Sequence, residues 1–124
     1  MENNFVTNYE QGKFLEEAFG EDTADFVYVD YGYTTRILPK NDMDAKSYPI
    51  LCYAWTLTAL RKLLPTSVDV GGVMCVFSSH NTFDNNWVYM YISDINNAPL
   101  YTKKESEIDA CYEMIAVLNK KGLL

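Results

Sequence analysis

The sequence is poor in the residues from which metal sites and nucleophilic sites are usually built. Its 124 residues include one histidine and three cysteines, Cys52, Cys75 and Cys111, which are widely separated and form no C-x-x-C pair. A zinc site therefore lacks the ligand spacing that it needs, and we expect no metal and no other cofactor. Small secreted domains usually carry an even, dense set of cysteines, so this odd and dispersed set favours a reducing compartment.

Long apolar runs are also missing. The longest nearly apolar run, residues 49–60, is about a dozen residues long, whereas a membrane-spanning helix needs ~20. The first residues, MENNF, hold an acid where a secretory signal needs bases, and no apolar segment with a cleavage site follows them. We therefore expect a cytoplasmic protein without a transmembrane helix.

Basic side chains are outnumbered, and the imbalance is local. Ten basic and 17 acidic side chains give a formal net charge of −7, which argues against direct nucleic-acid binding. Residues 1–30 hold eight acids and one base, whereas residues 31–124 hold nine of each. The acidic region is either a solvated face that aids solubility or a negative patch that docks on a basic partner. The residues assigned to this patch are Glu16, Glu17, Glu21, Asp22 and Asp25.

The remaining composition is that of an ordered globular chain, with 48% hydrophobic and 22% charged residues. A capping box from Thr7 to Glu10, followed by apolar residues at helical spacing, predicts a first helix over about 8–19. Residues 26–38 are rich in β-branched and aromatic side chains and are interrupted at Asp30–Gly32. They predict a hairpin, with one bulged strand as the alternative.

The second half of the pattern predicts two further helices and two further strands. A helix starting near Ser47 and ending before Pro65 is apolar nearly all round, which is typical of a central buried helix. Residues 70–77 and 87–92 read as paired antiparallel strands, with a bulge or bend at 71–72. A last helix is expected over about 103–121, capped by a box from Thr102 or, as the competing cap, by Ser106.

This order of elements, α-β-β-α-β-β-α, predicts one α+β domain over residues 1–124 without a linker. It would contain an antiparallel sheet of about four strands and three helices, because its short connections favour antiparallel neighbours over βαβ crossovers.

A catalytic site has little support. Cys75, His80 and Asp84 could supply a nucleophile, a base and an orienting acid. However, Cys75 lies in a strand where it shares a face with apolar neighbours, and free cysteine is usually buried. His80 lies in a polar turn, where hydrogen bonding within the turn is the simpler role. We assign no catalytic residues, and enzymatic activity is left as the less favoured reading.

Aromatic residues are unusually placed in the strand over 87–92. Trp87, Tyr89 and Tyr91 alternate with Val88, Met90 and Ile92, so the two sets lie on opposite faces. We expect the aliphatic face to pack on the core and the aromatic face to form a surface, which Tyr31 and Tyr33 could extend. The alternative is that these aromatic side chains cover a second small core. An exposed aromatic surface would serve as a dimer interface or a ligand platform.

Two hypotheses for function follow. The first is a non-enzymatic adaptor or inhibitor-like protein that uses the aromatic face and the acidic region to bind a basic protein partner or a second copy of itself, with a dimer expected. The second is a small-molecule-binding domain or minor enzyme with a pocket near His80, Asn81 and Asp84.

Overall fold

The computed structural model describes residues 5–94 and 97–124, so Glu2, one of the acids counted above, lies outside the described residues. The chain divides into two compact units, Met1–Ala59 (unit 1) and Leu60–Leu124 (unit 2). Each unit has an antiparallel sheet and at least one helix, which confirms the predicted α+β class. The described residues form two sheets, of three and four strands, and four α-helices, rather than one four-stranded sheet and three helices.

Unit 1 begins with helix α1 (Tyr9–Phe19), close to the predicted range. Its capping box lies one residue later than expected, between Asn8 and Gln11. Thr7 is instead buried, and its hydroxyl accepts a hydrogen bond from the backbone N–H of Trp55 at 3.1 Å. The helix ends at Gly20, whose φ of 82° lies in the region that favours glycine.

The sheet of unit 1 has β1 (Phe26–Asp30) between β2 (Thr35–Pro39) and β3 (Ile50–Ala54). β1 and β2 pair antiparallel, so the predicted hairpin is confirmed. The central helix predicted to start near Ser47 is wrong, because its residues form β3 and then the short helix α3 (Leu57–Arg61). A short run that is apolar on all sides does not distinguish a buried helix from a strand, and in β3 only Cys52 and Ala54 are buried.

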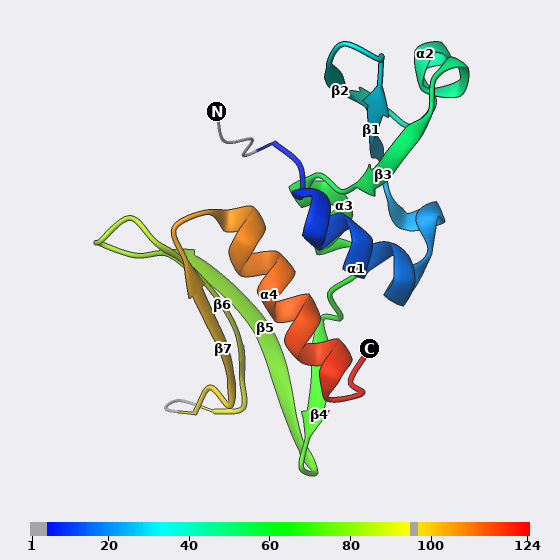
Figure 1. Cartoon of the computed structure of the whole chain (residues 1–124). Helices are drawn as coiled ribbons and strands as arrows, with labels where there is room; N and C mark the ends of the chain where they lie inside the picture. The colour runs from blue at the N-terminus through cyan, green and yellow to red at the C-terminus, as the bar shows by residue number, and fades with distance from the viewer. Residues whose placement is uncertain (1–4, 95–96) are drawn as a thin grey trace. The chain divides into compact units, whose positions relative to one another are not determined.

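Helices cover both faces of this sheet. α1 packs on β3 through Gly12, where an added Cβ would lie 2.3 Å from the carbonyl oxygen of Tyr53. On the other face, Ala45 of the short helix α2 (Met43–Ser47) is buried with Val27 and Val29. A 3-10 turn, η1 (Glu21–Thr23), connects α1 to β1 (Figure 1).

Unit 2 is a meander of four antiparallel strands with one long helix. The strands, in sheet order, are β4 (Ser67–Val70), β5 (Val73–Asn81), β6 (Trp87–Ile92) and β7 (Leu100–Lys104). The predicted pairing of the two central strands is confirmed. The outer strands were not predicted, and the glycines at 71 and 72, with φ of 61° and 87°, form the turn between β4 and β5 rather than a bulge.

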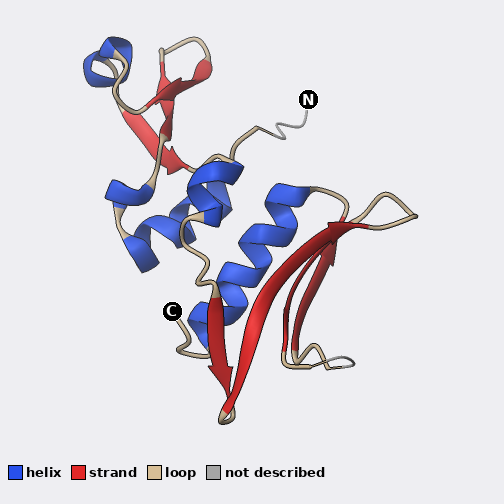
Figure 2. Cartoon of the chain, turned by 180° about the vertical axis from the view of Figure 1, so that it is seen from behind, coloured by secondary structure: helices blue, strands red, loops and turns tan. Residues whose placement is uncertain are grey.

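Helix α4 (Glu107–Lys120) lies along one face of this meander and contacts β6 and β7 (Figures 1 and 2). It begins at the competing cap, Ser106, because the residues just before it belong to β7. Over residues 5–94 and 97–124, no helix combines the length and the apolar character needed to cross a membrane.

Candidate functional site

The aromatic face of β6 forms the core of unit 2. Tyr89 and Tyr91 have no exposed surface, and Trp87 is half-buried. The hydroxyl groups of both tyrosines have half-buried partners, since Tyr89 donates to Oε2 of Glu107 at 2.7 Å and Tyr91 donates to the carbonyl of Pro65 at 2.7 Å. The prediction that this face is a surface is therefore wrong, and the alternative of a covered core holds.

Burial also sets the ionisation of these two phenols. It raises the pKa of Tyr91 to about 12. It raises the pKa of Tyr89 further, with the hydrogen bond to Glu107 acting in the same direction. The guanidinium of Arg61 lies 5.8 Å from the centre of the Tyr89 ring and 3.5 Å from Glu107, so the polar end of this core is closed by an ion pair. Tyrosine suits such a site because its apolar ring and its polar tip can both be accommodated.

The opposite face of the same sheet carries no helix of unit 2 in the described part of the chain (Figure 2). Strand register places side chains from three strands on it, because residues directly opposite each other in a sheet share a face. We call this surface the open face, and its exposed or half-buried large apolar side chains are Met74, Val76, Met90, Ile92 and Tyr101. The same register also places the buried Val88 and the polar residues Ser78, His80 and Lys103 on it.

The open face exposes large apolar side chains. Met74, Val76 and Tyr101 are 58%, 57% and 55% exposed, and the two residues of β6 between them are half-buried. Scattered apolar residues are normal on a surface, but these lie on adjacent strands and form one patch. Contiguous exposed apolar surface of this kind marks interaction sites.

Tyr31 and Tyr33 do not extend the face of β6, because they belong to the hairpin of the other sheet. Tyr31 stacks on Tyr48 with ring centres 4.4 Å apart and donates its hydroxyl to Asp44 at 2.9 Å. This hydrogen bond and partial burial raise the pKa of Tyr31, with burial the larger cause. Tyr33 is 82% exposed in the turn between β1 and β2.

Four of the five acidic-patch residues carry carboxylates that are available to solvent. Glu16 and Glu17 lie on α1, while Glu21 and Asp22 lie on η1. Glu16 is half-buried, and the other three are exposed. Within residues 5–59, no Asp or Glu lies at ion-pair distance from a lysine or arginine.

Asp25 has a structural role instead. It is half-buried, and its carboxylate accepts hydrogen bonds from the backbone N–H of Thr56, at 2.9 Å, and from the Thr56 hydroxyl. The Thr56 hydroxyl in turn accepts from the backbone N–H of Ala59 at the start of α3, at 3.3 Å. Assigning Asp25 to the docking patch is therefore not supported by its contacts.

The hairpin around His80 is held by its own polar residues. The side-chain amide of Asn81 donates to the carbonyl of Asn86 at 3.1 Å, which closes the turn. Asp84 accepts from the hydroxyl of Thr82 and pairs with Lys103 at 3.0 Å, and these contacts hold the pKa of Asp84 at about 2. His80 is exposed and is not the partner of Asp84.

The cysteines are buried in this structure. Cys75 is fully buried and donates weakly to the carbonyl of Val73, so it does not form the triad considered for His80. Burial raises the pKa of the Cys111 thiol to about 12 and also raises the pKa of Cys52. A thiol whose pKa is raised in this way is inert as a nucleophile at neutral pH.

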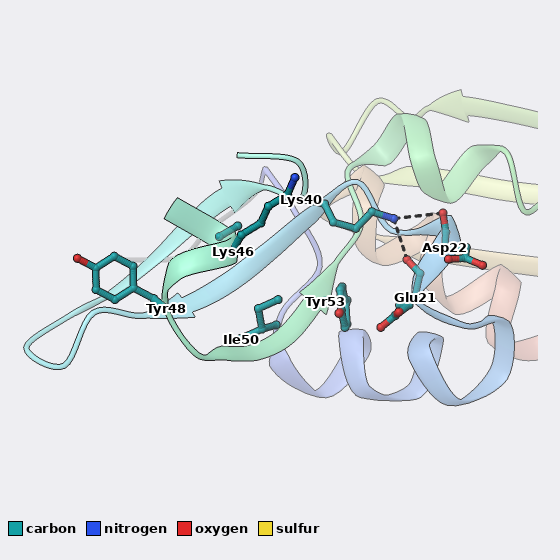
Figure 3. Close-up of a pocket in the computed structure, with 8 residues that line it drawn as sticks. Glu21, Asp22, Lys40, Lys46, Tyr48, Ile50 and Tyr53 are labelled. Atoms are coloured by element: carbon teal, nitrogen blue, oxygen red, sulfur yellow. Dashed lines mark hydrogen bonds between the residues drawn. The ribbon is translucent and has the colours of Figure 1, made fainter. Parts of the chain in front are cut away.

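A cavity of about 440 Å³ lies within unit 1, on the α2 side of the sheet (Figure 3). It is lined by residues of η1, α2 and β3 and by residues that follow β2 and α2: Glu21, Asp22, Lys40, Ala45, Lys46, Tyr48, Ile50 and Tyr53. Of the residues assigned to sites from the sequence, it includes Glu21 and Asp22 and none of His80, Asn81 and Asp84.

The sequence pattern did not reveal most of this cavity, because the helix predicted to start near Ser47 includes Ile50 and Tyr53, which the structure places in β3. The available signal was the strand-type run Ile50–Tyr53 directly after Pro49, which favours a strand that starts at a proline.

Comparison of the chain with protein-family models, with curated proteins and with solved structures finds no match in any of the three.

Proposed function

We propose that this chain is a non-enzymatic binding protein that contacts a protein partner through the open face of unit 2. The observation that carries the proposal is the exposure of Met74, Val76 and Tyr101, each more than half exposed on a sheet face that no helix of unit 2 covers in the described residues. Methionine and tyrosine are enriched in protein interfaces, because they supply large and adaptable contact area.

Charge defines the partner. Each copy of the chain carries a net charge of −7, which opposes self-association and attracts a protein whose surface around the contact is basic. The unpaired carboxylates of unit 1, among them Glu16 and Glu17, accelerate encounter with such a partner at long range. An adaptor or an inhibitor that covers a basic surface fits this combination.

The test compares two lysine substitutions at exposed apolar positions of unit 2. Val76→Lys places a charge in the open face, whereas Phe83→Lys places the same charge in the turn between β5 and β6, where Phe83 is fully exposed. The wild-type chain and both variants are used to capture proteins from a lysate at low and high salt, and the captured proteins are identified and quantified.

We expect the wild type and Phe83→Lys to retain the same basic protein in equal amounts. Val76→Lys should retain about tenfold less of it, which is the loss expected when a central contact is disrupted. Its retention falls as salt rises. Equal retention by both variants would show that the open face is not the contact. A wild-type dimer in sedimentation that Val76→Lys dissociates would replace the basic partner with a second copy.

A further inference from the structure

The cavity of unit 1 is lined by two lysines whose charges no carboxylate neutralises at close range. Nζ of Lys40 donates to two neutral groups, the carbonyls of Glu21 at 3.1 Å and Asp22 at 3.4 Å (Figure 3). Lys46 has no ion-pair partner and no hydrogen bond to another protein group within the described residues. An ammonium has three N–H donors, so Lys40 keeps one and Lys46 keeps three for a ligand.

The apolar floor of the cavity depends on an irregularity in the sheet. β1 and β3 pair with Tyr28 opposite Cys52 but with Val29 opposite Ile50, so Leu51 is an extra residue in β3. In a regular strand, Ile50 and Tyr53 would point to opposite faces, whereas here both line the cavity. Bulges that redirect a side chain are common beside functional sites.

Tyr48, which forms the wall of the cavity next to this floor, is held in place by Tyr31. Tyr48 lines the cavity, and the ring of Tyr31 stacks on it at an interplanar angle of 13°. Tyr31 is fixed in turn by its hydrogen bond to Asp44 and by the guanidinium of Arg36, 5.1 Å from its ring centre. A wall that is ordered before binding loses less conformational freedom when a ligand arrives.

Neither carboxylate of the lining, Glu21 or Asp22, lies at ion-pair distance from Lys40 or Lys46. Glu21 accepts a hydrogen bond from Tyr53, which raises the pKa of that phenol. The carboxylate of Asp22 points away from Ile50 and Tyr53 (Figure 3). The charged groups of the lining are therefore the ammonium groups of Lys40 and Lys46 together with the carboxylate of Glu21, which adjoins the floor at Tyr53 and already has a hydrogen-bond donor there.

We propose that this cavity binds a small anionic molecule with an apolar body, such as an aromatic carboxylate. The anionic group contacts Lys46 and the remaining donor of Lys40, and the body packs on Ile50 and Tyr53. A volume of about 440 Å³ suits a ligand of this size. Unit 1 has ten acidic and four basic side chains, so it repels an extended polyanion more strongly than an ion of one charge.

Two probes with the same ring and opposite charge test this assignment. The ¹⁵N-labelled full chain is titrated with 3-phenylpropanoate and, separately, with phenethylamine. The carboxylate is expected to shift the amide signals of Lys46, Ile50 and Tyr53 in a saturable manner, and the amine is expected not to. Lys46→Gln should weaken carboxylate binding by about tenfold, because it removes a charge-assisted contact.

Lys104→Gln is the matched control, since Lys104 is also exposed but lies in unit 2, and it should bind the carboxylate as the wild type does. An equal response to both probes, no saturable shift, or unchanged binding in Lys46→Gln would overturn the inference. Val76→Lys separates it from the proposed protein contact, because that variant should lose the protein partner and keep the carboxylate.

Discussion

The two units use their charged residues differently. Unit 1 has ten acidic and four basic side chains, and unit 2 has seven and six. The ion pairs of Arg61 with Glu107 and of Lys103 with Asp84 nevertheless belong to unit 2. Within residues 5–59, Lys40 donates to two carbonyls, Lys46 is exposed, and no carboxylate of the acidic patch lies at ion-pair distance from a lysine or arginine. The excess negative charge of unit 1 is therefore not neutralised by ion pairs within the described part of that unit.

The two sheets differ in a complementary way. The sheet of unit 1 has α1 against one face and α2 against the other, and its exposed apolar residues are limited to Ile50 and Leu51 of β3 and the end of β2 at Pro39. The sheet of unit 2 has α4 on one face only, and its second face exposes Met74, Val76 and Tyr101. Unit 1 thus presents charge and a cavity, while unit 2 presents apolar surface.

The largest expected effect tests whether the two units are also separate in stability. Met114 is fully buried in α4, so Met114→Ala should lower the free energy of unfolding of unit 2 by about 2–5 kcal/mol. Hydrogen exchange should show the loss of protection in α4 and β6 but not in β1. An equal loss in β1 would mean that the units unfold together. Met43→Ala, at a position 81% exposed, should change stability by less than about 0.5 kcal/mol.

A smaller loss of stability is expected in unit 1 from a substitution that adds volume instead of removing it. Gly12→Ala would force a methyl group against the carbonyl of Tyr53, and overpacking of this kind costs about 1–3 kcal/mol. The loss should appear as reduced exchange protection in α1 and β3. Glu17→Ala, on an exposed position of the same helix, is the control and should be nearly neutral. Wild-type protection in Gly12→Ala would show that α1 does not depend on this close approach.

The smallest expected effect is a titration that tests the internal pairing of unit 2. The pKa of Asp84 is about 2 in the folded chain, lowered first by the hydrogen bond from Thr82 and then by Lys103, against an ordinary value of 3.8. A lowered pKa stabilises the fold above the ordinary value, and this contribution is lost as the pH falls from about 4 to about 2. NMR titration of the carboxyl carbon should give the low midpoint, and Thr82→Val should raise it. An ordinary midpoint in the wild type would remove this difference between the units.

Local signals in the sequence were sufficient for several elements. Helical spacing predicted α1 even though its cap lies one residue later than expected, the break at Asp30–Gly32 predicted the β1–β2 hairpin, and the competing cap at Ser106 marks the start of α4. The pairing of β5 with β6 also followed from two adjacent strand-type runs. These elements depend on neighbours along the chain, which the sequence displays directly.

The predictions failed where residues distant in the sequence determine the local structure. In β3, Cys52 lies near Gly12 of α1 and Tyr53 packs against the Val27 and Ala45 cluster on the other face, so neighbours on both sides accept apolar residues and the sequence resembles that of a buried helix. The candidate cavity was missed with it, because the bulge that brings Ile50 and Tyr53 together is defined only against β1. No pattern within β3 records that pairing.

By itself, the sequence determined the α+β class, the ends of the first helix, the hairpin and the concentration of acidic residues near the start of the chain. It also determined that β6 has two chemically different faces. Only the tertiary structure decided which face is buried, because tyrosine can lie in a core once its hydroxyl has a partner. Glu107 and Pro65 supply those partners for Tyr89 and Tyr91, and both lie outside β6. The aromatic face is therefore core, whereas on the aliphatic face Val88 is buried and Met90 and Ile92 are half-buried.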